Sequence, residues 1–143
     1  MTPETSKLLF DAAVDARNNA YAIYSKFKVG AAALTEDGQI FTGCNIENAS
    51  FGGTICAERV AISKAICAGY KKIKAILIVA EYHEPISPCG ICRQVIAEFG
   101  SEALVLMANT KGQIQITSID KLLPFQFVLP KNNPTEYNMA TEE

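Results

Sequence analysis

Apolar residues recur along the chain with two different spacings, and each spacing predicts a type of element. Between residues 4 and 22 they return every three or four positions, which predicts an amphipathic helix packed on the domain. The stretches FKVGAAALT and QIFTGCNI instead have the length and composition of strands. The intervening EDG contains a D-G step, which is typical of a tight turn. We therefore expect a helix followed by a two-stranded hairpin.

Helical segments and buried strands alternate in the rest of the chain. A helical pattern runs from Ile55 to Ala68, and Gly69 is suited to the C-terminal end of that helix. The continuous apolar run KAILIVA predicts a strand that is buried on both faces. After the loop EYHEPISP, a second helix is expected to begin just after Pro88. Two strands, ALVLMAN and QIQIT, and a short helical segment, SIDKLLP, complete the pattern.

This order of elements predicts an α/β fold, a three-layer α/β/α sandwich around a mixed five-stranded sheet. Only TKG separates the last two strands, and a parallel crossover needs about a dozen residues, so these strands should pair antiparallel. We expect one domain over residues 1–130. Residues 131–143 are polar and have little apolar content, so we expect them to be a mobile tail.

Composition and charge limit the classes of function. The chain has 143 residues, 49% of them hydrophobic and 20% charged, which is ordinary for a globular protein. Its net charge of -2 does not favour nucleic-acid binding, because phosphate groups are bound by clustered lysine and arginine. The longest apolar stretch is too short to span a bilayer, and the first residues do not resemble a signal peptide. We therefore expect a cytoplasmic protein with a small-molecule substrate and neither a nucleic-acid nor a membrane partner.

The five cysteines are the first candidate chemistry. An odd number in a chain with no predicted export signal favours free thiols or metal ligands over a disulfide framework. Cys89 and Cys92 lie three positions apart at one helix start, and Cys56 lies at another. Three thiolates around one point would form a zinc site with an open fourth position, which is the catalytic pattern. Cys44 and Cys67 lie in apolar contexts and are expected to be core residues.

Two charged residues beside Cys56 fit such a site. Three thiolates and Zn²⁺ carry a net charge of about −1, which weakens the metal's effect on a bound water. Arg59 and the two helix N-termini would offset this charge. Glu58 would then lie beside the water. Cys56 and Glu58 can face one metal only if Cys56 lies in an irregular first turn, because two residues of regular helix point to nearly opposite sides.

Asn45 and Glu47 form a second candidate cluster. In a strand that ends at NIE, alternation puts both side chains on one face. An amide and a carboxylate side by side suit the hydroxyls of a sugar. The alternative is a pair of solvated polar residues at a strand end.

Taken together, these motifs resemble those of the zinc deaminases. C-A-E at 56–58 and P-C-G-I-C at 88–92 are similar to that signature. A cysteine as first ligand resembles the small, homotetrameric cytidine deaminases. The resemblance extends over about residues 20 to 127 and includes the segments YSKFKVGAAAL, GCNIENASF, TICAER, SPCGICRQV and LLPFQF.

The resemblance implies an activity and a cofactor. It implies one zinc ion per subunit, bound by Cys56, Cys89 and Cys92. The reaction would be the hydrolytic deamination of cytidine and 2′-deoxycytidine to uridine and 2′-deoxyuridine plus ammonia, in pyrimidine salvage. Glu58 would protonate N3 of the base and then the departing amine.

The same resemblance implies roles in substrate binding. Asn45 and Glu47 would bind the ribose, Phe27 would pack against the base, and the backbone of Ala57 would contact the base. In a homotetramer with sites near the subunit interfaces, Phe127 would reach a neighbouring site, although Phe125 is an alternative for that role.

Four other readings of the motifs remain. A dithiol redox protein would explain C-G-I-C but not Cys56, Glu58, Asn45 or Glu47. A structural zinc module would need a fourth protein ligand. A polynucleotide or tRNA deaminase is disfavoured by the net charge and by the short TKG link. An enzyme specific for a nucleoside antibiotic shares the zinc motif, but the segment N-I-E-N favours a free ribose.

His83 lies between acidic residues and is expected to be a solvated loop residue.

Overall fold

The computed structural model describes residues 1–130, and the predicted tail of residues 131–143 lies outside them. The first helix, α1 (Pro3–Arg17), begins where the Thr2 side chain accepts a hydrogen bond from the Thr5 amide. It ends five residues before the predicted limit. The chain leaves the helix at Asn18, a residue type that favours helix ends over helix interiors.

Five strands form one mixed sheet in the order β2-β1-β3-β4-β5. Their bounds are β1 (Val29–Thr35), β2 (Ile40–Cys44), β3 (Ile73–Ala80), β4 (Leu104–Asn109) and β5 (Ile114–Ser118). The pair β3–β4 is parallel and every other neighbouring pair is antiparallel. The predicted mixed sheet and the antiparallel last hairpin are therefore confirmed.

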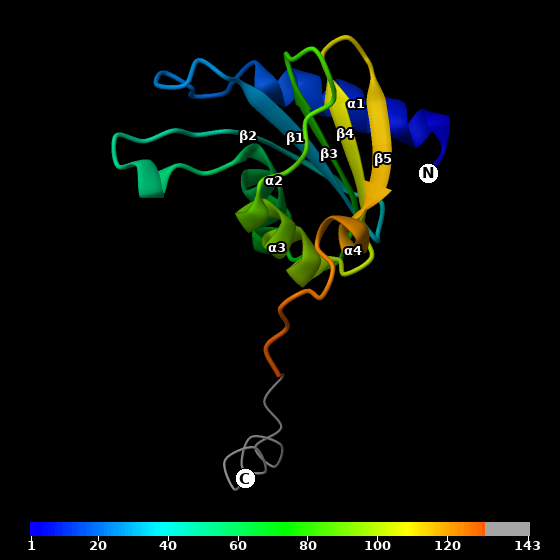
Figure 1. The fold of residues 1–143 in the computed structure, drawn as a ribbon. Helices are drawn as coiled ribbons and strands as arrows, with labels where there is room; N and C mark the ends of the chain where they lie inside the picture. Colours follow the sequence, from blue (N-terminus) through cyan, green and yellow to red (C-terminus); the bar gives the residue numbers. More distant parts are fainter. Residues whose placement is uncertain (131–143) are drawn as a thin grey trace, which may run out of the picture.

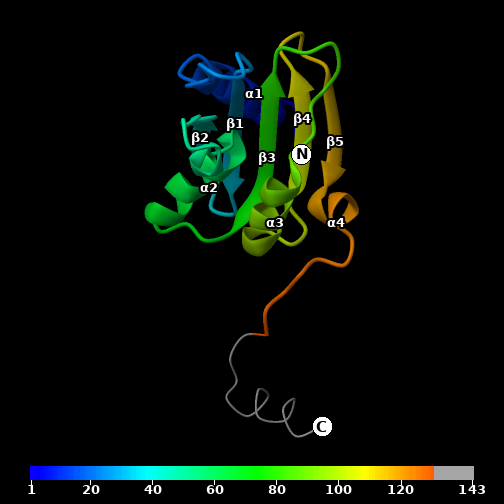
Figure 2. The same cartoon turned by 60° about the vertical axis from the view of Figure 1, so that its left-hand side comes forward.

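Helices cover both faces of the sheet and give the predicted three layers. α1 lies along one face, whereas α2 (Ala57–Cys67) and α3 (Gly90–Phe99) lie on the other, as the two views show (Figures 1 and 2). A short α4 (Ile119–Leu122) follows β5, and a single 3-10 turn, η1 (Phe51–Gly53), lies between β2 and α2. Within residues 1–130, no helix has the length and apolarity needed to cross a bilayer.

Alternating side chains of the central strands fill two separate cores. On β3, Ile76 and Ile78 pack under α2 and α3, whereas Leu77 and Val79 pack under α1. All four are almost fully buried. The prediction that KAILIVA is buried on both faces is confirmed.

Two other expectations about the chain are wrong. β2 ends at Cys44, so Asn45 and Glu47 lie beyond the strand and not within it. Beyond Cys44, Ile46 forms isolated bridges to Tyr21 and Ile55. Cys67 is exposed at the C-terminal end of α2, and Cys44 is half-buried, so neither is the core residue expected.

A glycine lets α2 approach the sheet. A Cβ atom added to Gly43 on β2 would lie 2.5 Å from the backbone nitrogen of Ala61 and closer still to the carbonyl oxygen of Ala57. No other residue type fits at this distance without moving the helix. Gly43 therefore fixes the first turns of α2, and with them Cys56 and Glu58, directly on β2.

Candidate active site and metal centre

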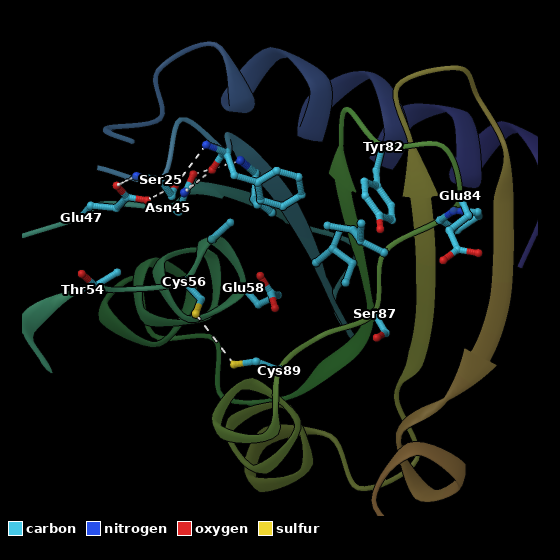
Figure 3. Close-up of a pocket in the computed structure, with 16 residues that line it drawn as sticks. Ser25, Asn45, Glu47, Thr54, Cys56, Glu58, Tyr82, Glu84, Ser87 and Cys89 are labelled. Atoms are coloured by element: carbon cyan, nitrogen blue, oxygen red, sulfur yellow. Dashed lines mark hydrogen bonds between the residues drawn. The ribbon is translucent and has the colours of Figure 1, made fainter. Parts of the chain in front are cut away.

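A cavity of about 560 Å³ opens beside the N-terminal ends of α2 and α3. Figure 3 shows three groups of side chains around it: Cys56, Glu58 and Cys89; Asn45, Glu47 and Ser25; and Tyr82 with Glu84. They come from segments distant in the sequence, and the fold brings them to one side of the sheet.

The three predicted zinc ligands lie together. The sulfur atoms of Cys56, Cys89 and Cys92 are all within 4.8 Å of one another, and Cys56 and Cys89 are 3.8 Å apart. Cys56 and Cys89 are the N-cap residues of α2 and α3, and Cys92 is buried in the first turn of α3. Thus two helix N-termini direct their positive partial charge toward the cluster.

The cluster favours a thiolate at Cys56. Hydrogen bonds from Cys92, from Arg59 and from Cys89 lower the pKa of the Cys56 thiol to about 5. The pKa of the Cys92 thiol is raised, because Cys92 acts as the donor to Cys56 and is also buried. Zinc binds cysteine as the thiolate, and this cluster offers three sulfur atoms, one of which ionises readily. The three residues therefore fit the metal.

Glu58 lines the same cavity from the second position of α2. Its side chain is only 5% exposed, and this burial raises the pKa of its carboxyl group. Cys56 has extended backbone angles (φ -70, ψ 153), so it lies outside the regular helix that begins at Ala57. The irregular geometry predicted for Cys56 is therefore present, and both residues line one cavity.

Arg59 lies behind Cys56 as predicted. Its Nη2 atom donates to the Thr54 carbonyl oxygen at 3.2 Å and is 3.8 Å from the Cys56 sulfur. The thiolate character of Cys56 raises the pKa of the guanidinium group. Its Nε is buried and makes no hydrogen bond within residues 1–130. The position is the one required of a cation that offsets thiolate charge.

Asn45 and Glu47 are both buried and both hold the segment between α1 and β1. Asn45 donates to the Phe27 carbonyl oxygen at 2.8 Å and accepts from the Val29 amide at 2.9 Å. The Oε1 atom of Glu47 accepts from the backbone amides of Tyr24 and Ser25, each at 3.0 Å. These hydrogen bonds bring both polar side chains to the cavity even though they lie beyond the end of β2.

Two of the remaining predicted residues line the cavity and one does not. Phe27, which is 39% exposed, and Ala57 are part of its wall. Phe127 is exposed and does not line it, although its carbonyl oxygen accepts a hydrogen bond from Gln94. Phe125 is fully exposed and has a positive φ of 55. Neither residue contributes to the cavity of its own chain.

Several residues that line the cavity were not predicted as site residues from the sequence, and Tyr82 and Ser25 are two of them. Tyr82 lies in the loop after β3 and meets the ring of Phe27 edge-on, with 6.4 Å between the ring centroids. Ser25 donates its hydroxyl hydrogen bond to Glu47. For Tyr82, the sequence offered one signal: an aromatic residue in the polar loop that leads to the P-C-x-x-C motif.

Comparisons with known proteins agree with this geometry. Residues 3–108 match the family described as cytidine and deoxycytidylate deaminase zinc-binding region. A cytidine deaminase of Sporosarcina psychrophila is 53% identical over 113 residues, which cover 78% of this chain and 83% of the relative. The chain belongs to the cytidine deaminase family. It is therefore a zinc-dependent hydrolase of the cytidine deaminase type.

Further relatives add detail within the cytidine deaminase family. The crystal structure of a cytidine deaminase from Burkholderia pseudomallei superimposes with a TM-score of 0.83 at 49% identity, over 89% of this chain and all of that one. A blasticidin-S deaminase of Bacillus cereus is also similar, at 32% identity over 72% of this chain and 79% of its own length. The cytidine deaminase fold is thus shown, and the relatives include an enzyme that is named for an antibiotic.

Proposed function

We propose that the protein deaminates cytidine and 2′-deoxycytidine by hydrolysis, forming uridine or 2′-deoxyuridine and ammonia, and that it serves pyrimidine salvage in the cytoplasm. The observation that carries this proposal is one cavity lined by two of the clustered thiols, the buried Glu58 and the polar pair Asn45 and Glu47. A hydrolytic centre and a sugar-binding pair in one cavity suit a nucleoside.

The metal would be held by Cys56, Cys89 and Cys92. Bound zinc supplies a Lewis acid that lowers the pKa of a water molecule. No fourth His, Cys, Asp or Glu joins the cluster within residues 1–130, so a position is left for that water. This supports a catalytic over a purely structural zinc site.

Glu58 is proposed to move the protons of the reaction. Burial raises the pKa of its carboxyl group, which makes the carboxylate a better base than an exposed one. It would accept one proton from the attacking water and deliver it to N3 of the base. It would then take the remaining proton from the new hydroxyl group on C4 and deliver it to the amine, which leaves as ammonia while C4 becomes a carbonyl. Water and cytidine then give uridine and ammonia with no other reactant. Arg59 would offset thiolate charge throughout.

The cavity wall supports a nucleoside over a nucleotide. Among the described residues that line the cavity, none is lysine or arginine, whereas three are glutamates: Glu47, Glu58 and Glu84. A phosphate group would meet negative charge and no cationic partner. Phe27 would pack against the base, the backbone of Ala57 would contact it, and Asn45 and Glu47 would bind the sugar hydroxyls.

We further propose a homotetramer in which Phe127 completes a neighbouring site. Phe127, Val128 and Leu129 are all about 70% exposed in the single chain, so their apolar surface is available for a subunit contact.

The decisive experiment measures the fall in ultraviolet absorbance when zinc-loaded protein is mixed with cytidine or 2′-deoxycytidine, with Glu58→Ala run in parallel. Turnover that this variant loses would support both the reaction and the role of Glu58. Deoxycytidine monophosphate and blasticidin S are assayed beside them. Turnover of either compound in preference to the nucleosides would overturn the substrate proposal.

A further inference from the structure

Ser25 lies at the centre of the hydrogen bonds that shape the sugar side of the cavity. Its hydroxyl donates to the Oε2 atom of Glu47 and accepts from the backbone amide of Phe27 at 3.0 Å. Its own backbone amide donates to the Oε1 atom of Glu47. One residue therefore contacts both the carboxylate proposed to bind the sugar and the backbone of the phenylalanine proposed to pack against the base. Figure 3 shows Ser25 beside Glu47 at one end of the cavity.

The donors and acceptors around Ser25 fix the direction of each hydrogen bond in this network. The Phe27 amide can only donate, so the single proton of the Ser25 hydroxyl is directed to Glu47. That hydrogen bond is the largest of the effects that lower the pKa of the Glu47 carboxyl group, followed by the hydrogen bond from the Ser25 amide. Glu47 is thus an ionised group that only accepts, and a sugar hydroxyl that meets it must donate.

The two oxygen atoms of Glu47 are not equally available. Within residues 1–130, Oε1 accepts two backbone hydrogen bonds, whereas Oε2 accepts only the one from the Ser25 hydroxyl. A carboxylate oxygen has two lone pairs in the plane of the group. A sugar hydroxyl would therefore bind at Oε2, beside the Ser25 hydroxyl, and the orientation of that lone pair depends on the hydrogen bond from Ser25.

We infer that Ser25 is a positioning residue that aims Oε2 of Glu47 at a sugar hydroxyl, and so determines how strongly the enzyme prefers nucleosides that carry the sugar hydroxyls. The inference rests on the function proposed above. Ser25 acts through Glu47 and does not take part in the chemical step, so its loss affects KM for hydroxylated substrates more than kcat.

The test compares cytidine with 2′,3′-dideoxycytidine in wild type, Ser25→Ala and Ser25→Thr. A hydrogen bond to a charged group is worth roughly tenfold to a hundredfold in binding. We expect Ser25→Ala to lower kcat/KM for cytidine about tenfold, mainly through KM, and to change kcat/KM for dideoxycytidine less than about twofold. Ser25→Thr keeps the hydroxyl and should keep the preference. Ser63→Ala, an exposed serine on α2 that does not line the cavity, is the matched control.

A double-mutant cycle with Glu47→Ala separates an indirect role from direct contact. If Ser25 acts through Glu47, Ser25→Ala has no further effect on cytidine once Glu47 is removed. An equal loss in both backgrounds would mean that Ser25 contacts the sugar itself, and would overturn the inference. Equal losses for both substrates would also overturn it, because a general disturbance of the cavity would then be the cause. If wild type turns over neither substrate, the proposed function itself fails.

Discussion

The metal side and the sugar side of the cavity are built in different ways. Cys56, Glu58 and Cys92 lie at the starts of α2 and α3, and α2 packs closely on β2, where a glycine fixes its approach. Asn45 and Glu47 lie in irregular backbone beyond β2, and side-chain to backbone hydrogen bonds hold them to the segment between α1 and β1. Helix packing thus positions the residues of the metal side, whereas hydrogen bonds between loops position the residues of the sugar side.

This difference predicts different consequences of the same substitution. Residues on packed elements keep their position when a side chain changes, so a substitution there should lower the rate of the chemical step and leave the shape of the cavity unchanged. Residues that hold loops have two roles, since their removal changes both the contact with the ligand and the shape of the cavity. Replacing a glutamate by its neutral isostere on each side tests this contrast directly.

The largest effect is expected from Glu58→Gln. Because glutamine keeps the shape but cannot carry a proton, kcat for cytidine should fall by a factor of about 10² to 10⁴. KM, bound zinc and the melting temperature should change little. Steady-state kinetics with metal analysis checks this expectation. A variant that retained most of its kcat would remove Glu58 from the proton transfers.

Glu47→Gln should produce the opposite kinetic pattern. The amide accepts less strongly from the two backbone amides and directs a donor at the Ser25 hydroxyl, so the sugar side should lose affinity. We expect KM for cytidine to rise about tenfold and kcat to change only a few-fold. The measurement is the same kinetic series as for Glu58→Gln. A fall in kcat as large as that of Glu58→Gln would show that the two sides of the cavity are not distinct.

Gly43→Ala tests the packing that fixes the metal side. The added methyl group would overlap backbone atoms of α2, so the free energy of unfolding should decrease by about 1–3 kcal/mol and catalysis should weaken as Cys56 and Glu58 shift. Gly52→Ala, in the 3-10 turn between β2 and α2, meets no atom within 4 Å and should be close to neutral. Denaturant unfolding of both variants measures the contrast. Equal stability of the two would show that α2 can move away from β2 at no cost.

The smallest effect concerns pH. The folded-state pKa of Glu47 lies below its unfolded value, so its ionised form stabilises the fold above the unfolded pKa, and this contribution is lost as pH falls through the folded pKa. The difference in melting temperature between wild type and Glu47→Gln should therefore narrow below about pH 4.3, the ordinary glutamate pKa. Thermal melts from pH 3 to pH 7 test this. If the difference in melting temperature stayed constant over this pH range, ionisation of Glu47 would not be linked to folding.

The same contrast explains which features the sequence could predict. Continuous apolar runs and cysteines at helix starts report regular elements, so the sheet, its hairpins and the thiol cluster were all predicted. The end of β2 and the contacts of Ser25 and Tyr82 were not. They depend on hydrogen bonds and ring contacts between segments about 20 or more residues apart, and no local pattern encodes these. The role proposed for Phe127 involves a neighbouring subunit, which no pattern within one chain describes.

Cys56 and Cys89 each occupy the N-cap of a helix, and neither side chain caps the helix by a hydrogen bond. An ion held by both sulfurs joins two helix starts that are 33 residues apart in the sequence. A zinc ion bound there would therefore act as a reversible cross-link, which would close a chain loop as a disulfide would but would respond to metal supply instead of oxidants.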